Sequence, residues 1–319
     1  MLGILLTNIG TPAAPRAREV RRFLRRFLSD RRVVELPPLA WYPILYGLVL
    51  PLRGPKSARA YQRIWMSAGS PHAIYTERLR LALERELESR RPAQTRVEAA
   101  FLYGGQSIAQ GLERLRAAGA TRIIALPLFP QTSGTTTGAA YDEIARCLRE
   151  QRDVPDIRLI PGYATHPDYI GALVATLQEH WQEQGAKSHL LMSFHGIPIR
   201  CVTKGDPYEV QCRATAARVA SALQLSADQW TISFQSRFGA ERWLEPATYA
   251  TLTSLAARGT RAVTVFCPGF SVDCLETLEE IAIGGRELFL HAGGARFDYV
   301  AALNDRAAHA HALAELLLA

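Results

Sequence analysis

A histidine and a short file of carboxylates are the side chains in this sequence whose types and spacing could support chemistry. His195 follows the apolar run LLMSF and directly precedes the residues GIP. Asp273, Glu276 and Glu280 occur within CPGFSVDCLETLEEI at i, i+3 and i+7, a spacing that predicts one helical face. An imidazole near such carboxylates suits a general acid–base pair or an open site for a divalent metal ion.

Structural roles could account for some of these acids. Asp273 lies near the start of the predicted helix, where the helix dipole alone favours a carboxylate, and Glu280 could be an ordinary solvated position. Glu276 lies one turn further in, just beyond a strand, and is the acid most strongly indicated for function. The sequence contains no HExxH metal pattern, no GxGxxG after the first strand, no GxxxxGK[ST] loop and no GxSxG elbow. Dinucleotide, nucleotide-triphosphate and serine-hydrolase chemistry is therefore disfavoured.

Composition narrows the class of protein. The net charge is +7, and all but three of the 37 basic residues are arginine, which is typical of codon bias but would also suit carboxylate ligands or an anionic membrane face. No nucleic-acid-binding motif accompanies this charge, so nucleic acid is not an expected partner. The odd number of cysteines and the absence of CxxC argue against a disulfide framework and a cysteine-only metal site. With no basic leader at the start of the chain, we expect a cytoplasmic protein.

Alternating patterns predict the elements that position these residues. Apolar runs of strand length alternate with helical patterns, which indicates parallel sheets covered by helices on both faces. Strands that are apolar throughout agree with burial on both sides. The predicted strands cover 2–8, 96–103, 122–129, 189–195, 230–235 and 261–268, and the clearest helices cover 74–90, 107–118, 166–184 and 245–257.

The two halves of the chain resemble each other. ILLTNIGTP (4–12) aligns with LLMSFHGIP (190–198), and AAGATRIIAL aligns with AARGTRAVTV. We therefore expect two similar Rossmann-like domains, 1–162 and 163–319. The alignment places Ile9 opposite His195, each just after a strand, where ligands bind in open α/β sheets. Two such domains would form a cleft with one apolar and one reactive wall.

The first half carries an insertion. Ile9 and Thr121 are 112 positions apart (121 − 9), whereas His195 and Thr260 are 65 apart (260 − 195), an excess of about 47. The candidate segment is about 32–75, which contains LPPLAWYPILYGLVLPLRGP. Its prolines are expected to break it, so it should not cross a bilayer as one helix. We interpret it as an exposed apolar lip that grips a flat ligand or contacts a membrane surface, with Trp41, Leu45 and Leu48 on its exposed face. The alternative is a loop folded into the core.

At this point the motifs indicate a family. SFHGIP together with CPGFSVDCLETLEEI resembles the ferrochelatases, which insert ferrous iron into protoporphyrin to make haem. The resemblance extends over essentially the whole chain: GILLTNIGTP, FLSDRRVVELP, GSPHAIYT, PLFPQTSGTTTGAAYDE, GDPYEVQCR and FQSRFGAERWL match the enterobacterial-type protoporphyrin enzymes in order. It implies a chelatase-type fold with a porphyrin cleft between the domains. It also implies a lyase that catalyses the terminal step of haem biosynthesis, with protoporphyrin IX and Fe²⁺ as substrates and two protons released.

The resemblance also implies roles for residues. His195 and Glu276 would carry metal insertion and contact the metal, with His195 either a proton acceptor or an iron ligand. Asp273 and Glu280 would form an acidic track on the helix 273–287. The residues implied around the macrocycle are Ile9, Tyr103, Ser236, Trp243 and Phe270, with Arg31, Arg32 and Arg53 near the lip as candidates for the propionates.

Some positions depart from the animal-type pattern. Leu102 replaces an arginine before the tyrosine, Ile9 replaces a methionine that faces the catalytic histidine, and Cys274 replaces a histidine beside the helix acids. Gly134 stands where the animal enzymes have an iron–sulfur cysteine, and no cysteine follows Cys274. We therefore expect no iron–sulfur cluster and no other tightly bound cofactor, and propionate recognition by different residues.

Two other functions remain open at this point. One is a non-enzymatic porphyrin or haem carrier, and the other is a chelatase for another tetrapyrrole such as coproporphyrin or sirohydrochlorin. The pairing of His195 with Glu276 favours an enzyme, and the lip and motifs favour protoporphyrin. We expect a monomer, with an oligomer left open, and weak peripheral contact with the inner face of the cell membrane.

Overall fold

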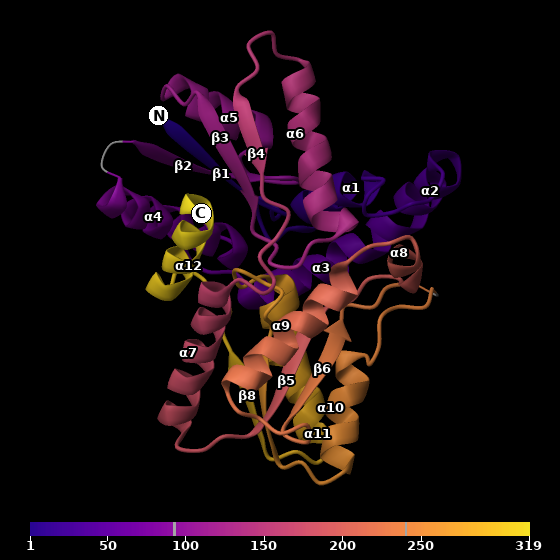
Figure 1. The fold of residues 1–319 in the computed structure, drawn as a ribbon. Coiled ribbons are helices and arrows are strands. Elements are labelled where there is room, and N and C mark those ends of the chain that lie inside the picture. The colour runs from indigo at the N-terminus through magenta and orange to yellow at the C-terminus, as the bar shows by residue number, and fades with distance from the viewer. Residues whose placement is uncertain (92–93, 240) are drawn as a thin grey trace. The chain divides into compact units, whose positions relative to one another are not determined.

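The computed structural model describes residues 1–91, 94–239 and 241–319, which form two compact units (Figure 1). The first unit contains Met1–Phe129, Ser133–Gly162 and Leu317–Ala319, and the second contains Pro130–Thr132 and Tyr163–Leu316. Ala240, in the FQSRFGAERWL motif, and residues 92–93 lie outside the described residues.

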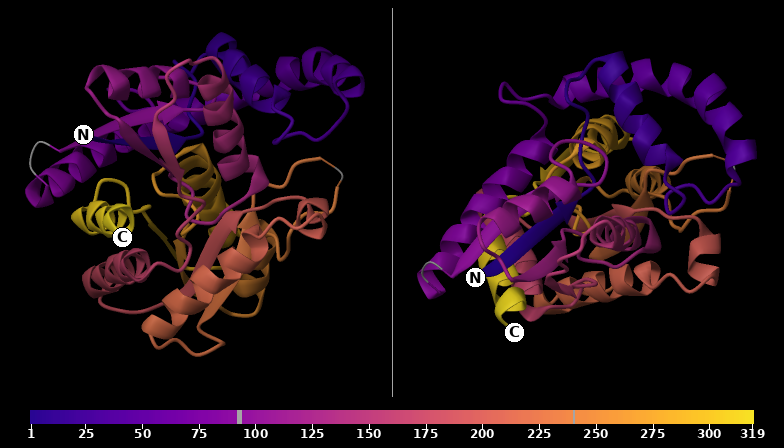
Figure 2. Two further views of the ribbon diagram at one scale, coloured as in Figure 1. Left: turned by 45° about the horizontal axis from the view of Figure 1, so that its top comes forward. Right: turned by 90° about the horizontal axis from the view of Figure 1, so that it is seen from above.

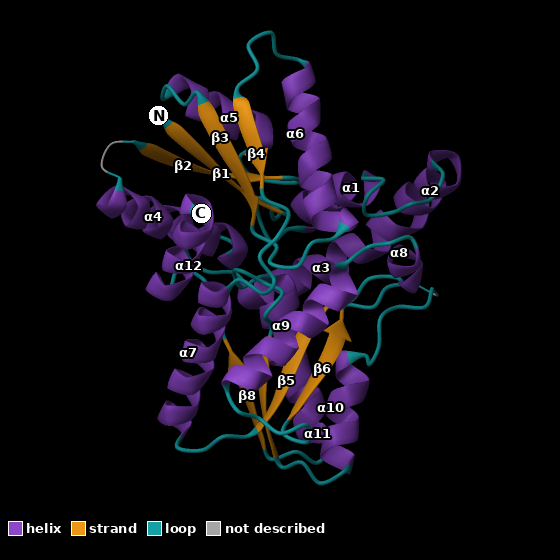
Figure 3. Ribbon diagram, in the orientation of Figure 1, coloured by secondary structure: helices purple, strands orange, loops and turns teal. Residues whose placement is uncertain are grey.

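The first unit is built on a parallel sheet in the order β2-β1-β3-β4 (Figure 3). Ile4, Leu5 and Leu6 of the central strand β1 are fully buried, as expected for a strand covered on both faces. Its strands are β1 (Leu2–Asn8), β2 (Thr95–Phe101), β3 (Arg122–Pro127) and β4 (Asp156–Leu159). Its helices are α1 (Ala17–Ser29), α2 (Pro38–Ile44), η1 (Leu45–Val49), α3 (Leu50–Ile64), α4 (Pro71–Arg90), α5 (Ile108–Ala117), η2 (Gly134–Gly138) and α6 (Ala139–Arg149).

The second unit repeats this design with a parallel sheet in the order β6-β5-β7-β8. Its strands are β5 (His189–His195), β6 (Trp230–Gln235), β7 (Ala262–Phe266) and β8 (Arg296–Val300). Its helices are α7 (Pro167–Gln184), α8 (Ile199–Thr203), α9 (Tyr208–Ala222), α10 (Thr248–Ala257), η3 (Glu276–Gly285), α11 (Arg286–His291) and most of α12 (Ala307–Leu318).

The strand order confirms the predicted internal repeat. In each sheet the unit's first strand lies between its second and third strands, and the fourth strand is at the edge. Ile9 follows the last paired residue of β1, and His195 is the last residue of β5. The alignment therefore places these two residues at equivalent strand ends, one in each unit.

The predicted lip segment is helical, and the expectation that its prolines break it is wrong. The helices α2, η1 and α3 follow one another without interruption, and Figure 2 shows them as one curved run. Pro38 begins α2, where its missing N–H costs no hydrogen bond. The π-helical turn η1 lies between Pro43 and Pro51, and Pro55 lies inside α3, so the helical run continues through three prolines. Among the described helices, none has the length and apolar content needed to cross a membrane.

The exposed face of this segment differs from the predicted one. Trp41 is only 7% exposed, and its Nε1 donates a hydrogen bond to the Leu28 carbonyl oxygen at 2.7 Å. Leu45 is fully buried, so of the three residues expected on the exposed face only Leu48 lies there, at 56% exposure. We define the apolar lip by the exposed side chains of Leu36, Leu39, Tyr42, Ile44, Tyr46, Leu48 and Leu52.

Candidate functional site

His195 closes strand β5 in a fixed orientation. Its Nδ1 lies 2.6 Å from the Gly196 carbonyl oxygen. A carbonyl oxygen only accepts hydrogen bonds, so in the neutral ring Nδ1 carries the proton and Nε2 keeps a free lone pair. A Cβ on Gly196 would lie 2.9 Å from the Gln235 carbonyl oxygen and 3.2 Å from the Trp243 ring, so only glycine fits after the histidine. The Gly-x-Pro turn therefore presents an imidazole whose Nε2 can take a proton or bind a cation.

The carboxylates do not share one α-helical face, so this prediction is wrong for Asp273. The π-helix η3 begins at Glu276, and Asp273 precedes it with only 2% exposure. The Asp273 carboxylate accepts hydrogen bonds from Thr277 Oγ1 at 2.9 Å, Tyr299 OH at 2.5 Å and Asn304 Nδ2 at 2.7 Å. A carboxylate with this many donors anchors the start of η3 and is not available as part of an acidic track.

The anchoring partners of Asp273 were not found from the sequence. Tyr299 and Asn304 come 26 and 31 residues later in the chain. No helical or strand spacing links such distant positions, so only the packing of β8 beside β7 reveals them. A buried aspartate is expected to have hydrogen-bond donors around it, and this expectation was the one signal in the sequence that Asp273 has such partners.

Glu280 interacts with the other reactive side chains of the second unit. Burial raises its pKa and Glu276 raises it further, whereas the donors of Ser236 and the charge of His195 act in the opposite direction. The Ser236 backbone N–H donates to Glu280 Oε1 at 2.7 Å, and its hydroxyl donates to Oε2 at 2.5 Å. The predicted residues His195, Glu276, Glu280 and Ser236 therefore belong to one electrostatic cluster of this unit.

Aromatic side chains border this cluster. The Phe270 ring lies 6.5 Å from the His195 ring, centroid to centroid. Trp243 forms an isolated bridge with Pro198, and its Nε1 is buried without a hydrogen-bond partner among the described residues. Within those same residues, no group of three or more His, Cys, Asp or Glu side chains is arranged to hold a metal ion.

Ile9 and Tyr103 adjoin each other in the first unit. The Tyr103 N–H donates to the Ile9 carbonyl oxygen at 3.0 Å, which fixes the two loops that follow β1 and β2. The Tyr103 hydroxyl donates to Asp30 Oδ2 at 2.6 Å, and burial raises its pKa. Its phenol therefore organises the loop after α1, and its ring is only 6% exposed.

The three arginines predicted near the lip have different surroundings. Arg32 forms two hydrogen bonds with Asp142, at 2.7 and 3.0 Å, and this contact raises its pKa. Any contact of Arg32 with a propionate would have to compete with this pair. Burial lowers the pKa of Arg53, and Arg31 is exposed. The sequence alone did not distinguish these three side chains.

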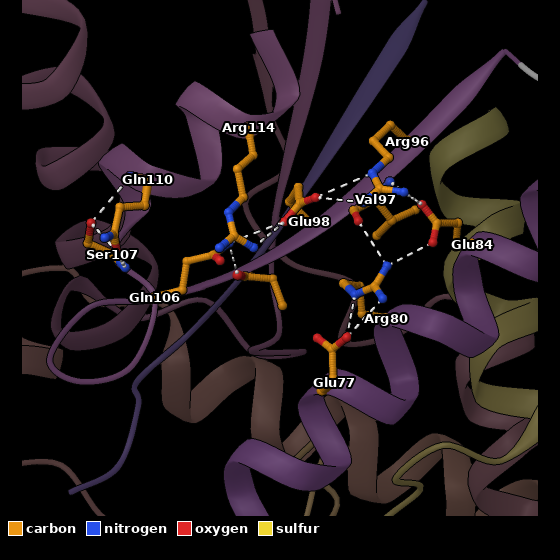
Figure 4. Close-up of polar contacts among 11 residues, drawn as sticks. Glu77, Arg80, Glu84, Arg96, Val97, Glu98, Gln106, Ser107, Gln110 and Arg114 are labelled. Atoms are coloured by element: carbon orange, nitrogen blue, oxygen red, sulfur yellow. Dashed lines mark hydrogen bonds and ion pairs between the residues drawn. The ribbon is translucent and has the colours of Figure 1, made fainter. Parts of the chain in front are cut away.

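A separate polar hollow of about 160 Å³ lies between α4 and β2 in the first unit (Figure 4). Arg80 contacts Glu77 and Glu84, both at 2.8 Å, and Arg96 contacts Glu98 at 3.2 Å. These guanidinium groups face carboxylates, so the hollow has compensated charge. The ion pair between Arg96 and Glu84 connects α4 to the edge strand β2. None of the predicted site residues lines the hollow.

Comparisons with known proteins agree with this geometry. A family model described as Ferrochelatase matches residues 1–319. Ferrochelatase from Aeromonas hydrophila is 48% identical over 315 residues, which cover 99% of this chain and 97% of that protein. Ferrochelatase from Yersinia pestis is 45% identical over 315 residues, with the same two shares.

Solved structures show the fold. The structure of SirB from Bacillus subtilis with Fe³⁺ has a TM-score of 0.57 at 13% sequence identity. The match covers 99% of this chain and 94% of the SirB chain. The structure of CbiX, described as the terminal enzyme for biosynthesis of siroheme in denitrifying bacteria, has a TM-score of 0.52 at 14% sequence identity. The match covers 99% of this chain and 98% of the CbiX chain. The similarity confirms the predicted chelatase-type fold.

Proposed function

The chain belongs to the ferrochelatase family, and we propose that it inserts ferrous iron into protoporphyrin IX, with His195 and Glu276 as the catalytic residues. The family match over residues 1–319 carries this proposal. The activity is that of a lyase in the terminal step of haem biosynthesis. His195 at the end of β5 and Glu276 at the start of η3 support the assignment of the residues.

Iron insertion requires a base. Two pyrrole protons leave the macrocycle, and a flat ring hides its nitrogen lone pairs, so binding energy from the ring edges should bend it. His195 donates its Nδ1 proton to Gly196 and presents Nε2. Nε2 can accept a pyrrole proton; alternatively, its lone pair can bind the incoming iron, and the proton then passes to another base.

The two glutamates complete this chemistry. Glu276 as a carboxylate compensates the charge of the cation beside His195. Glu280 has a pKa raised chiefly by burial, so it binds a proton more readily than an exposed glutamate does. We assign Glu280, whose carboxylate accepts hydrogen bonds from Ser236 alone among the described residues, to carry protons away from the site. We assign Asp273 a structural role, because it is 2% exposed and accepts hydrogen bonds from three different side chains.

The porphyrin contacts are assigned from both units. Trp243 and Phe270 offer apolar surface near His195, and Ile9 offers it at the equivalent strand end. Ser236 and Tyr103 border the macrocycle in this proposal, although their hydroxyls are engaged by Glu280 and Asp30. Arg31, Arg32 and Arg53 are the candidates for the propionates; Arg31 and Arg32 are exposed, and Arg32 is already paired with Asp142.

The protein is proposed to work without a tightly bound cofactor. Gly134, which begins η2, stands where an iron–sulfur cysteine would be needed, and all five cysteines are buried. Burial raises the pKa of Cys267 and of Cys274, which disfavours the thiolate form that binds a cluster. We expect no acid-labile sulfide in anaerobically purified protein, and stoichiometric sulfide would contradict this assignment.

We propose that the protein is cytoplasmic and contacts the membrane weakly through the apolar lip of its first unit. The apolar lip exposes Leu39 at 94% and Leu52 at 66%, and Lys56 and Arg59 follow on α3. A helix that combines an apolar face with basic residues can lie at an anionic membrane surface. We propose that the sparingly soluble porphyrin reaches the protein from this membrane surface. We also propose that the protein acts as a monomer.

Replacement of His195 tests the proposed function. His195→Ala should lower kcat for anaerobic iron insertion at least about 100-fold, because a positioned general base contributes a factor of this order. Porphyrin binding, followed by fluorescence quenching, should remain. His291→Ala changes an exposed histidine on α11 and serves as the control. Near-normal turnover by His195→Ala would remove His195 from the mechanism.

Comparison of substrates tests the tetrapyrrole. Protoporphyrin IX, coproporphyrin and sirohydrochlorin should be offered to the parent protein under the same anaerobic conditions. We expect the highest kcat/KM for protoporphyrin IX. Porphyrin binding without turnover of any of the three would instead identify a carrier.

A further inference from the structure

We propose that Gln235 is a positioning residue that sets the spacing between His195 and Glu276; this inference rests on the function proposed above. Gln235 ends β6 and is only 3% exposed. It pairs with His195 across the sheet. No motif in the sequence singled it out, yet it is in contact with the segments that carry both proposed catalytic residues.

On one side, Gln235 holds the turn that presents the imidazole. The Gly196 N–H donates to the Gln235 carbonyl oxygen at 2.7 Å, and this contact fixes the peptide that follows His195. The Ser193 hydroxyl, two residues before His195, donates to Gln235 Oε1 at 2.7 Å. The carboxyl end of β5 is therefore attached to Gln235 through both its main chain and its side chain.

On the other side, Gln235 holds the start of η3. Its Nε2 donates to the Glu276 carbonyl oxygen at 2.8 Å. The direction of the amide is fixed, because a carbonyl oxygen needs a donor and only the NH₂ group supplies one. Oε1 then faces the Ser193 hydroxyl and the Cys267 thiol, which lies 3.6 Å away. The Gln235 amide therefore accepts a hydrogen bond through Oε1 and donates one through Nε2.

This bridge differs from the anchor formed by Asp273. Asp273 ties η3 to Tyr299 in β8 and to Asn304 in the segment that follows β8; among the described residues, its side-chain hydrogen bonds do not extend to β5. Gln235 connects β5 to η3, so its loss should shift Glu276 relative to His195. A displacement near 1 Å at a reacting centre can cost about 100-fold in rate. Gln235 acts through its two neighbours and has no assigned contact with a substrate.

Two substitutions separate positioning from stability. Gln235→Met keeps an unbranched side chain of similar size and removes both polar atoms. Gln235→Glu keeps the acceptor for Ser193 and loses the donor to Glu276 until its carboxyl is protonated. The matched control is Trp181→Phe, which removes the buried bond from Trp181 Nε1 to Thr264 Oγ1 at 2.9 Å. Thr264 pairs with Leu190, at the opposite end of β5 from His195.

The measurements are anaerobic iron insertion with protoporphyrin IX, thermal unfolding, and hydrogen exchange of peptides covering 276–285. Gln235→Met should lower kcat at least about tenfold, with the porphyrin KM within about twofold and faster exchange in 276–285. The kcat of Gln235→Glu relative to the parent should recover as pH falls, because the protonated carboxyl again donates to Glu276. Trp181→Phe should lose thermal stability and keep kcat.

Two outcomes would contradict the proposed role of Gln235. A Gln235→Met protein with the parent's kcat and the parent's exchange in 276–285 would overturn the inference. So would an equal loss of kcat in Trp181→Phe, because that loss would follow from stability alone. If the parent protein itself inserts no iron, the proposed function fails. The exchange data would still test the link between Gln235 and η3.

Discussion

At the scale of single residues, the two glutamates of η3 are expected to differ. Glu276 begins the helix, is half-buried, and is held through its main chain by Gln235. The Glu280 carboxylate is already bonded to Ser236. Glutamine at position 280 keeps an oxygen that accepts from the Ser236 N–H, and its NH₂ group can donate to the Ser236 hydroxyl. Glutamine at position 276 loses the negative charge beside the metal path.

Glu276→Gln should therefore lose most activity and Glu280→Gln should lose less. Kinetics at several ferrous iron concentrations distinguish weaker iron binding from a slower chemical step. We expect kcat/KM for iron to fall at least about 100-fold in Glu276→Gln. Parent-like turnover of Glu276→Gln across the whole iron range would refute the assignment of this carboxylate.

The sequence singled out the candidate reactive residues, and it did not reveal the side chains that hold them in place. His195 and Glu276 stand out because imidazole and carboxylate at strand ends have few structural reasons to occur there. Asp273 was placed on the helix because a spacing rule assumes 3.6 residues per turn, which a π-helix does not obey. Gln235 was missed because a buried amide has no characteristic spacing, and only its contacts reveal its role.

At the scale of elements, strands at the centre of each sheet were predicted and two edge strands were not. β1 and β5 are apolar because both faces are covered, whereas β4 alternates exposed and half-buried residues and β8 is half polar. The helix through Pro43 and Pro51 was also missed. A helical run that continues through prolines leaves no simple mark in the sequence.

The apolar lip leads to a prediction at this scale. Replacing Leu39, Leu48 and Leu52 with serine removes apolar area that is 94%, 56% and 66% exposed. Exposed substitutions usually change the free energy of unfolding by less than about 0.5 kcal/mol each. The triple variant should therefore stay folded, bind anionic vesicles more weakly in sedimentation assays, and show a higher porphyrin KM.

Trp41→Ser is the contrasting control. Trp41 is 7% exposed and loses both its packing and its bond to Leu28 on substitution. Such a change in a core costs roughly 3–5 kcal/mol. Unchanged vesicle binding by the triple serine variant would show that the lip does not contact membranes, whatever its effect on KM.

At the scale of the whole molecule, each unit buries one neutral histidine away from the candidate site. His72 in α4 and His309 in α12 are 8% and 0% exposed, and burial lowers the pKa of each to about 4. His309 Nδ1 has the Asn304 carbonyl oxygen as a partner at 2.7 Å. His72 Nδ1 is buried without a partner among the described residues, and the ring lies 5.9 Å from that of Phe101.

These histidines predict loss of stability in mild acid. An unfolded histidine has a pKa near 6.5, so between about pH 6.5 and pH 4 the unfolded state binds a proton that the folded state excludes. Each of these two histidines therefore lowers stability as pH decreases through this window and has no such effect above about pH 6.5. A difference of about 2.5 units corresponds to roughly 3 kcal/mol for each histidine.

His72→Phe tests the contribution of the first unit. The phenyl ring keeps the contact with Phe101 and cannot be protonated, so the free energy of unfolding should fall less between pH 7 and pH 5 than in the parent. Urea denaturation across this range measures the two slopes. His291→Phe, at an exposed position, should leave the parent's pH dependence unchanged. Parallel slopes for His72→Phe and the parent would mean that His72 is already accessible to protons in the folded protein.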